Sequence, residues 1–406
     1  MRLTWLSNAP WCNYGYGQQA ALFTPRLTEA GHPIGIIANY GHEGNPINFN
    51  GVQVFGKSFH PWGMDVLHSH SVTFKADAML SMIDIQVMEP DALMGTKWLP
   101  WFPVDHITIQ PTIFEKLQYA FHPITMSKHA SAEMDKTGIE YSYVPCGVDT
   151  KVFKPLDRAQ ARETQKLPAD KFIVGMVAAN KGSRKAFHQN IMAFAALKAK
   201  RGDCVLYLHT LDGLRNGYET SDLTAFCKAI GLKHGYAFNE SSKDADVIFA
   251  DQYGLALGYD SNMMAQLYSA MDVHMGVTMG EGFGIPIIEA QACGTPVIVG
   301  DWTSMPELVF SGWKVDKKDA EPVFTPMNAF QYLPHPGAIA EKLDAAYLMR
   351  GNMDYRKRAA DGAKAYDADK IVQKYWLPVL KKIEDKLQTP IPTLLDASLD
   401  MLRVAA

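Results

Sequence analysis

The sequence predicts an α/β protein of two doubly wound, Rossmann-like domains that face each other across a cleft. Short apolar runs rich in β-branched residues alternate with helical patterns, as in parallel sheets whose strands are joined by helices. The polar stretch 155–170 interrupts this alternation, which then begins again. The interruption is typical of an interdomain linker, so we expect two sheets. Ligands of such sheets bind beyond the carboxyl ends of the strands.

The first half begins with the apolar run 2–7, a helical pattern over Tyr16–Ala30 and a stop at Gly31. Residues 41–65 are rich in Gly, Asn and Pro and predict loops with a short hairpin. Further strands are expected at 33–40, 98–105, 122–127 and 141–146, with helices at 112–121 and 128–138.

The second half predicts a sheet of its own. Its strands are expected at 172–179, 204–210, 246–252, 272–278 and 295–300, and its helices at 184–200, 220–231, 261–271 and 285–293. We therefore expect a first domain over 1–160, a second over 161–370 and a helical tail over 371–406. Helices are expected at 366–387 and 393–406, and the tail is expected to pack back on the first domain.

The amino-acid composition argues against several classes of function. The 406 residues carry 39 basic and 43 acidic side chains, a net charge of −4, which gives no electrostatic footprint for nucleic-acid backbones. The five cysteines contain no C-x-x-C pair, so neither a disulfide framework nor a zinc site is indicated, and a reducing cytoplasm fits best. Apolar runs are too short for a signal peptide or a membrane span. We expect a soluble cytoplasmic protein with at most peripheral membrane contact.

The segment Met279–Ile298 is the most informative part of the chain. Pro286 suits the first turn of a helix and Gly294 its end. The N–H groups at 284–288 would then be free and, with the helix dipole, would form a site for a diphosphate. Glycines at alternate positions before the helix let the backbone approach a ligand closely, namely Gly280, Gly282 and Gly284.

Two carboxylates border the same crevice, because Glu281 lies in this loop and Glu289 lies eight residues later in the helix. A carboxylate beside a diphosphate cannot be its counter-charge. Carboxylates do accept hydrogen bonds from hydroxyl groups. We therefore expect Glu281 to bind a transferred sugar and Glu289 to bind a ribose.

The run EGFGIPIIEAQACGTPVI resembles the retaining glycosyltransferases of family 4, whose signature is two glutamates around a G-F-G loop. Two other segments are similar to that family, VPCGVDTKVFKP at 144–155 and SNAPWCNYGYGQQ at 7–19. The resemblance implies the two-Rossmann-domain GT-B fold. It assigns donor binding to Gly282, Phe283, Gly284, Ile285 and Glu289, and to Gly15 and Gly17 in the first glycine-rich loop.

The family also holds the diphosphate with an arginine and, five residues later, a lysine after the first strand of the second domain. Lys185 falls on the lysine position, but Asn180 stands where the arginine is expected. A diphosphate leaving group needs compact positive charge when no metal is present. Arg184 or Lys181 is the candidate for the missing cation.

His106 stands where the family has a histidine at the cleft, close to the reacting carbon, and Asp105 is expected to orient or charge it. His68 and His70 rank below His106, because their distance to the next strand is longer than usual in the family. Gln252 follows a strand at the level where the nucleotide base would lie.

The resemblance implies sugar transfer with retention from a UDP- or GDP-linked donor, with no metal ion required. A sugar-nucleotide epimerase, a phosphorylase on the same architecture and a catalytically inactive sugar-nucleotide-binding protein remain as alternatives. The acceptor stays open among lipid, polysaccharide, protein and modified nucleic acid, because the loops at 41–65 and 85–97 that would select it match no known pattern.

Overall fold

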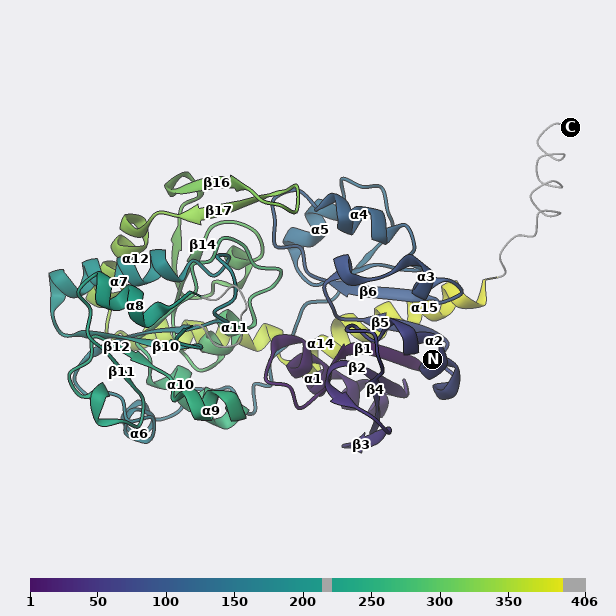
Figure 1. Cartoon of the computed structure of the whole chain (residues 1–406), viewed down its shortest axis with the longest axis horizontal. Coiled ribbons are helices and arrows are strands. Elements are labelled where there is room, and N and C mark those ends of the chain that lie inside the picture. The colour runs from purple at the N-terminus through teal and green to yellow at the C-terminus, as the bar shows by residue number, and fades with distance from the viewer. Residues whose placement is uncertain (214–220, 390–406) are drawn as a thin grey trace, which may run out of the picture.

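The computed structural model describes residues 1–213 and 221–389. The chain forms two lobes, each built around its own parallel sheet, as expected (Figure 1). The C-terminal helix expected at 393–406 lies outside the described residues.

The first sheet has eight strands in the order β3-β4-β2-β1-β5-β6-β7-β8. All neighbours are parallel except β3, which pairs antiparallel with β4. The strands are β1 (Leu3–Asn8), β2 (Ile34–Glu43), β3 (Ile47–Phe49), β4 (Val52–Lys57), β5 (Ala78–Ser81), β6 (Trp98–Phe102), β7 (Ile124–Thr125) and β8 (Ser142–Tyr143). The helices of this lobe are α1 (Gly15–Glu29), α2 (Leu67–Phe74), α3 (Pro90–Leu93), α4 (Pro111–Leu117) and α5 (Lys128–Met134).

The second sheet has seven parallel strands in the order β11-β12-β10-β9-β13-β14-β15, and a separate antiparallel hairpin joins β16 to β17. The strands are β9 (Phe172–Val177), β10 (Cys204–His209), β11 (His234–Tyr236), β12 (Val247–Phe249), β13 (Val273–Met275), β14 (Val297–Gly300), β15 (Gly312–Val315), β16 (Ala320–Phe324) and β17 (Phe330–Pro334). The helices are α6 (Arg158–Thr164), α7 (Phe187–Arg201), α8 (Leu223–Ala229), α9 (Gln252–Leu257), α10 (Ser261–Ala270), α11 (Ile285–Ala292), α12 (Pro336–Leu348) and α13 (Met353–Ala363).

Local sequence explains the turns that the fold needs. Gly31 ends the first helical region with a φ of +94°, a conformation that costs a glycine little. The two-residue loop between β3 and β4 is Asn50–Gly51, and both residues have positive φ. Asn-Gly is the preferred pair for such a tight hairpin turn. The short hairpin expected within 41–65 is therefore present.

Each sheet has a point at which the strand order reverses. In the first sheet β1 lies between β2 and β5, and in the second β9 lies between β10 and β13. A crevice opens outside the carboxyl ends of the strands at such a switch point. A ligand-binding site is therefore expected on the loops that follow β1, β5, β9 and β13.

The boundary between the domains lies earlier than the sequence indicates. Residues 155–170 contain α6, so the expected division at 160/161 falls inside a helix. This helix packs on α10 of the second domain. Arg162 is buried there and donates hydrogen bonds to Asp272 Oδ2 at 2.7 Å and to the Ala270 carbonyl at 3.0 Å. The second domain therefore begins upstream of α6.

The described part of the tail returns to the first domain, as expected (Figure 1). It consists of α14 (Ala368–Ile371), a π-helical turn (Val372–Trp376) and α15 (Leu377–Gln388). Trp376 is fully buried and its ring meets those of Trp5, Trp101 and Phe23 at centroid distances of 5.7, 5.0 and 6.0 Å. The amino group of Met1 also donates to Glu384 Oε1 on α15 at 2.7 Å.

This aromatic contact is expected to anchor the tail. Trp376→Ala should lower the free energy of unfolding by about 3–5 kcal/mol, because it removes a large side chain from a closed core. Trp62→Ala is the control, since that ring is 42% exposed and should cost less than about 1 kcal/mol. Urea titration measures both values. Equal losses in the two variants would contradict the anchoring role.

Candidate active site

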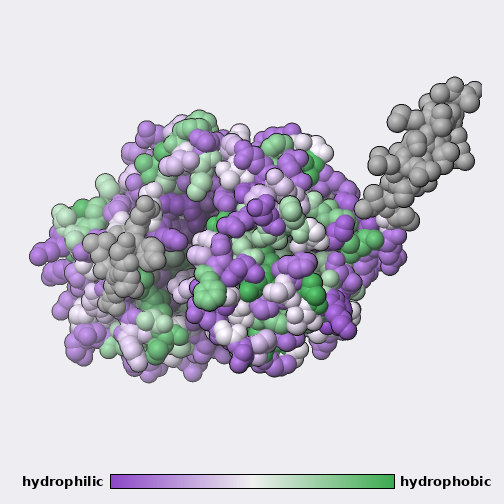
Figure 2. Space-filling view, turned by 45° about the vertical axis from the view of Figure 1, so that its right-hand side comes forward, coloured by the Kyte–Doolittle hydropathy of each residue, from purple (hydrophilic) through white to green (hydrophobic). Residues whose placement is uncertain are grey.

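Five of the expected site residues lie on loops that follow the carboxyl ends of strands: Asp105 and His106 follow β6, Arg184 and Lys185 follow β9, and Glu281 follows β13. Gly15 and Gly17, expected in a loop, instead lie in the first turn of α1. On the face drawn in Figure 2, a hydrophilic hollow opens between the two lobes.

Glu281 is the centre of an ion-pair cluster. Lys185 Nζ donates to its Oε1 at 2.6 Å, and the Arg184 guanidinium donates to its Oε2 at 3.1 Å. The same guanidinium donates to the Gly280 carbonyl at 2.8 Å, and its Nε lies 3.5 Å from Asp105 Oδ2. The cluster thus joins the two domains and balances two cations with two carboxylates.

The electrostatics follow from this pairing. Burial alone would raise the pKa of Glu281, but the charges of Lys185 and Arg184 outweigh burial and lower it. Burial and the charge of Arg184 lower the pKa of Lys185, although Glu281 opposes the shift. For Arg184, burial is outweighed by Glu281 and Asp105, which raise the pKa. Glu281 is therefore held ionised between its two partners.

Asp105 and His106 form a close pair, as expected. His106 Nδ1 lies 2.6 Å from Asp105 Oδ1. Burial would raise the pKa of Asp105, but the hydrogen bond with His106 and the charge of Arg184 lower it. On the other side of the ring, His106 Nε2 lies 3.0 Å from Thr325 Oγ1, at the tip of the β16–β17 hairpin.

This hairpin crosses from the second domain onto the loop that carries His106. Ile107 and Phe330 exchange two backbone hydrogen bonds, at 2.8 and 3.2 Å. Gln331 Nε2 donates to the Asp105 carbonyl at 3.3 Å. The hairpin was not predicted from the sequence, and it fixes the Asp105–His106 pair from the side of the second domain.

Glu289 occupies a different environment from Glu281. It is buried on α11 and accepts a hydrogen bond from the Tyr268 hydroxyl at 2.8 Å. Burial raises the pKa of Glu289 to about 7, because the single hydrogen bond from Tyr268 only partly compensates. The two glutamates of the motif therefore differ in charge state near neutral pH.

The start of α11 offers fewer N–H groups than expected at 284–288. Pro286 has none, and the Ile287 N–H donates to the Gly284 carbonyl at 2.9 Å. Gly284 caps the helix with a φ of +105°. Within the described residues, no hydrogen bond engages the N–H groups of Gly284 or Ile285. These two remain for an anion, supported by the helix dipole.

Gly280 and Gly282 serve the interface between the domains. A Cβ on Gly280 would lie 2.0 Å from the Asp105 carbonyl oxygen, and one on Gly282 would lie 2.1 Å from Pro103 Cβ. Neither position tolerates a side chain in this arrangement. The sequence analysis expected these glycines to let the backbone approach a ligand. In the structure they instead let the first domain approach the loop.

Three consecutive residues after β14 hold the loop and were not singled out from the sequence. Ser304 Oγ donates to the carbonyls of Glu281 and Phe283 at 2.7 and 2.8 Å. The Glu281 N–H donates to Thr303 Oγ1 at 3.1 Å, and Trp302 Nε1 donates to the Thr278 carbonyl at 3.0 Å. Such contacts link distant segments and leave no local pattern in the sequence.

Asn180 and Gln252 lie in the second domain, and their side-chain amides are hydrogen-bonded to backbone groups. Asn180 Nδ2 donates to the carbonyls of Leu211 and Ser221 at 3.1 and 2.7 Å. Gln252 Nε2 donates to Thr210 and Ala250 carbonyls, and its Oε1 accepts from the Asp212 N–H at 3.1 Å. Both side chains brace neighbouring loops here.

Arg184 lies in the ion-pair cluster and Lys181 is exposed, so the structure favours Arg184 as the second cation.

The side chain of Phe283 is buried in the core and its ring lies 5.8 Å from the Tyr366 ring, so only the backbone of Phe283 is left to contact a ligand. A Cβ on Gly15 would lie 3.0 Å from Ile285 Cδ1, which brings the loop after β1 to the start of α11. Packing also requires glycine at position 17, because a Cβ there would lie only 2.6 Å from the Cys12 carbonyl oxygen.

His68 and His70, the remaining histidine candidates, do not join the ion-pair cluster. His70 stacks on Phe55 at 4.8 Å and its Nε2 lies 3.1 Å from the Gly56 carbonyl, whereas His68 is exposed. Over residues 1–213 and 221–389, no group of three or more His, Cys, Asp or Glu side chains could hold a metal ion.

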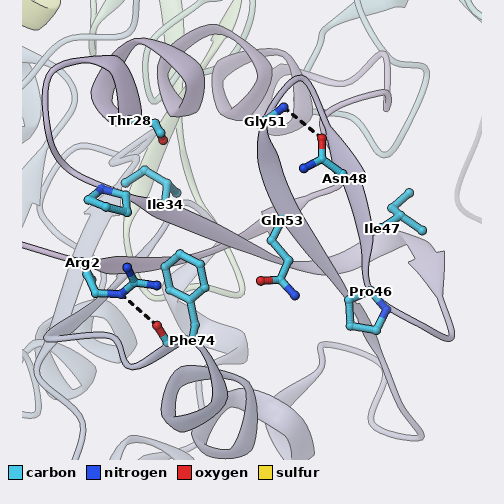
Figure 3. A pocket seen from close by; sticks show the side chains of 10 residues that line it. Arg2, Thr28, Ile34, Pro46, Ile47, Asn48, Gly51, Gln53 and Phe74 are labelled. Carbon is cyan, nitrogen blue, oxygen red and sulfur yellow. Dashed lines mark hydrogen bonds between the residues drawn. The ribbon is translucent and has the colours of Figure 1, made fainter.

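A pocket of about 440 Å³ lies at the other end of the first sheet (Figure 3). Arg2, Ile34 and Gln53 line it, and these residues stand at the beginnings of β1, β2 and β4. Arg2 Nε donates there to the Phe74 carbonyl at 3.0 Å. Ligands of doubly wound sheets bind at the opposite ends of the strands, so this pocket is not the candidate site.

The sequence is similar to that of known proteins. Residues 171–328 match the family described as "Glycosyl transferases group 1". A D-inositol 3-phosphate glycosyltransferase from Arthrobacter sp. is 26% identical over 259 residues, covering 62% of this chain and 55% of that protein. The chain spans about half the length of the curated relatives it matches.

Solved structures agree on the fold. Sucrose-phosphate synthase from Thermosynechococcus elongatus superposes with a TM-score of 0.71 at 16% identity, covering 95% of this chain and 99% of that one. Anabaena HepE, solved with UDP and glucose, superposes with a TM-score of 0.63 at 16% identity, covering 94% and 100%. The architecture is therefore the GT-B fold of glycosyltransferases, as expected. None of the helices in the described ranges is long and apolar enough to span a bilayer.

The ion-pair cluster gives a direct test of the site. Glu281→Gln leaves Lys185 and Arg184 without their shared carboxylate, so we expect a loss of about 3 kcal/mol in unfolding free energy. Added inorganic pyrophosphate should restore much of the loss, because it supplies negative charge to the same cations. Denaturant titration with and without pyrophosphate measures both effects.

Asp385→Asn is the matched control. It removes a 2.6 Å ion pair with Lys381 that is exposed on α15, and should change stability by less than about 0.5 kcal/mol with no response to pyrophosphate. If Glu281→Gln behaves like this control, the cluster is not an anion site.

Proposed function

We propose that the chain is a retaining, metal-independent glycosyltransferase that moves a sugar from a UDP- or GDP-linked donor to an acceptor hydroxyl. The group 1 match over 171–328 and the GT-B fold support a glycosyltransferase. The observation that carries the finer proposal is the convergence of Lys185, Arg184 and the N–H groups at the start of α11 on one loop.

The donor diphosphate is proposed to lie on the N–H groups of Gly284 and Ile285, with Lys185 and Arg184 as its counter-charges. Both cations are paired with Glu281 before the donor binds. A diphosphate would compete for them and release the Glu281 carboxylate. Glu281 would then be free to accept hydrogen bonds from the hydroxyl groups of the sugar, the role that the sequence predicts.

Sugar transfer passes through an oxocarbenium-like state, so stabilising the departing diphosphate lowers the barrier most. We propose that the bond from the anomeric carbon to the diphosphate oxygen breaks and the bond to the acceptor oxygen forms on the same face. The acceptor proton passes to the departing diphosphate. The Asp105–His106 pair, fixed by the β16–β17 hairpin, would border the sugar from the first domain.

The structure of HepE with UDP and glucose supports a nucleoside diphosphate sugar as donor. All five cysteines are free thiols, which suits the reducing cytoplasm that we propose as the location. An inactive sugar-nucleotide-binding protein would bind the donor and release no nucleoside diphosphate. An epimerase would return a changed sugar nucleotide, so product analysis separates it from a transferase.

Turnover is expected to survive excess EDTA, because the helix start, Lys185 and Arg184 take the role that a divalent ion has in other transferases. Release of nucleoside diphosphate from a panel of UDP- and GDP-sugars measures the rate. Loss of turnover in EDTA that manganese restores would show that a metal ion is required.

The affinity for a nucleoside diphosphate is expected to rise as pH increases from 6 to 8. Glu289 has a pKa of about 7, and its ionised form is the better acceptor for the ribose hydroxyls, so affinity is lost as pH falls through 7. Glu289→Gln should weaken binding roughly 10- to 100-fold at pH 8 and flatten the dependence on pH. Calorimetry at several pH values measures it.

Glu307→Gln is the control for this titration. Burial also raises the pKa of Glu307 to about 7, but this carboxylate accepts the Lys128 N–H of the first domain at 2.9 Å. That variant should keep the dependence on pH. The assignment of the ribose to Glu289 is wrong if Glu307→Gln alone removes it.

A further inference from the structure

A tyrosine–aspartate pair outside the family signature faces the same cleft. Asp84 lies three residues beyond the end of β5, and Tyr16 lies in the first turn of α1, just after β1. Strands β1 and β5 are neighbours at the switch point of the first sheet. The pair therefore borders the crevice in which a ligand of the first domain would bind.

The pair presents a fixed hydrogen-bond acceptor. The Tyr16 hydroxyl donates to Asp84 Oδ1 at 2.6 Å. Asp84 is exposed, and within the described residues no hydrogen bond engages its Oδ2. Burial and the nearby Asp84 raise the pKa of Tyr16 well above its usual value, so its hydroxyl stays a donor. Tyr16 thus fixes one carboxylate oxygen and leaves the other open to the cleft.

The pair also lies close to the ion-pair cluster. The charge of Asp84 acts on Arg184, and Arg184 and Asp105 act on the hydroxyl of Tyr16. A Cβ on Gly15, next to Tyr16, would lie 3.0 Å from Ile285 Cδ1, so this turn of α1 lies close to the first residue of α11. A molecule held by Asp84 would therefore face the proposed donor site across the cleft.

The charges around the Tyr16–Asp84 pair indicate which class of molecule could bind there. The loops at 7–16 and 81–90 contain no lysine or arginine. Asp84 and Asp105 are the carboxylates on this side of the cleft, and Arg184, the cation whose charge acts on Tyr16, is shared by Glu281 and the Gly280 carbonyl. A phosphate group placed here would meet carboxylates without a free counter-charge.

We infer that Asp84, held by Tyr16, binds the hydroxyl groups of a neutral polyol acceptor, such as a sugar or cyclitol without a phosphate group. This rests on the proposed glycosyltransferase function and adds the class of acceptor to it. Asp84 acts in recognition and takes no proton: it accepts a hydrogen bond that orients the polyol, while the transfer proceeds as proposed above.

The test compares transfer to neutral acceptors, myo-inositol, glucose and methyl glucoside, with transfer to inositol and glucose monophosphates. The donor is the UDP- or GDP-sugar that the chain hydrolyses fastest. The wild-type chain should prefer the neutral acceptors. Asp84→Asn should raise the KM for them roughly 10- to 100-fold and relax the discrimination against the phosphates. Tyr16→Phe should raise the KM less, because the carboxylate remains.

Neither variant should lose donor hydrolysis or nucleoside diphosphate affinity, because removing the Asp84 charge leaves the cations of the donor site in place, and this separates acceptor recognition from the donor site. The matched control is the Tyr141–Asp135 pair, whose 2.6 Å hydrogen bond joins α5 to the stretch before β8 in the same domain. Asp135→Asn and Tyr141→Phe should leave every one of these parameters unchanged.

Three results would overturn the inference. The first is an acceptor KM in Asp84→Asn within threefold of the wild-type value. The second is a wild-type chain that prefers the phosphates, or transfers to none of the neutral polyols, while it still binds nucleoside diphosphate and hydrolyses the donor. Both leave the proposed function standing. The third is a wild-type chain that neither binds nucleoside diphosphate nor turns over a donor, which removes the proposed function as well.

Discussion

The site depends on one electrostatic constraint, the sharing of the Glu281 carboxylate between Lys185 and Arg184. Two cations brought together at the edge of a parallel sheet repel each other and lose hydration, so they need a carboxylate between them. Glu281 meets this need, with 12% of its side chain exposed. The loop that carries Glu281 is in turn fixed by Ser304, and the two domains meet at its glycines. Removing the carboxylate would therefore disturb more than one interaction.

Under the proposed function, this arrangement is a site that is ready for an anion. The two cations already lie together on Glu281, and a donor diphosphate would need only to displace one carboxylate. Electrostatic groups that are fixed in advance lower a barrier without paying for reorganisation during the reaction. The Asp105 carboxylate couples the cluster to the first domain through Arg184. Binding of an anion would therefore change ion pairs of both domains.

Much of the fold could be predicted from the sequence, because the relevant signals are local. Gly31 ends a helix, Asn50–Gly51 makes a hairpin turn, and the strands β9 and β10 are continuous apolar runs. The central strand β5 (Ala78–Ser81) was not predicted from the sequence. The β16–β17 hairpin was missed because its pattern of exposed residues resembles a loop. Its importance appears only through contacts with the first domain.

The residues of the site could be listed from the sequence, but their contacts could not. The spacing of Glu281 and Glu289 predicts that both border one crevice, and says nothing of the ion pairs of Glu281 or of the Tyr268 hydroxyl on Glu289. Asn180 was placed in the donor site by position alone, and its amide instead braces the backbone of two loops. Contacts of this kind join segments far apart in the chain, so no local pattern encodes them.

The most direct test of the account is a crystal structure of the chain with a bound nucleoside diphosphate. The account predicts diphosphate oxygens within hydrogen-bond distance of the Gly284 or Ile285 N–H groups, with Lys185 Nζ turned from Glu281 to the diphosphate. A diphosphate bound elsewhere, with the 2.6 Å contact between Lys185 and Glu281 intact, would contradict it.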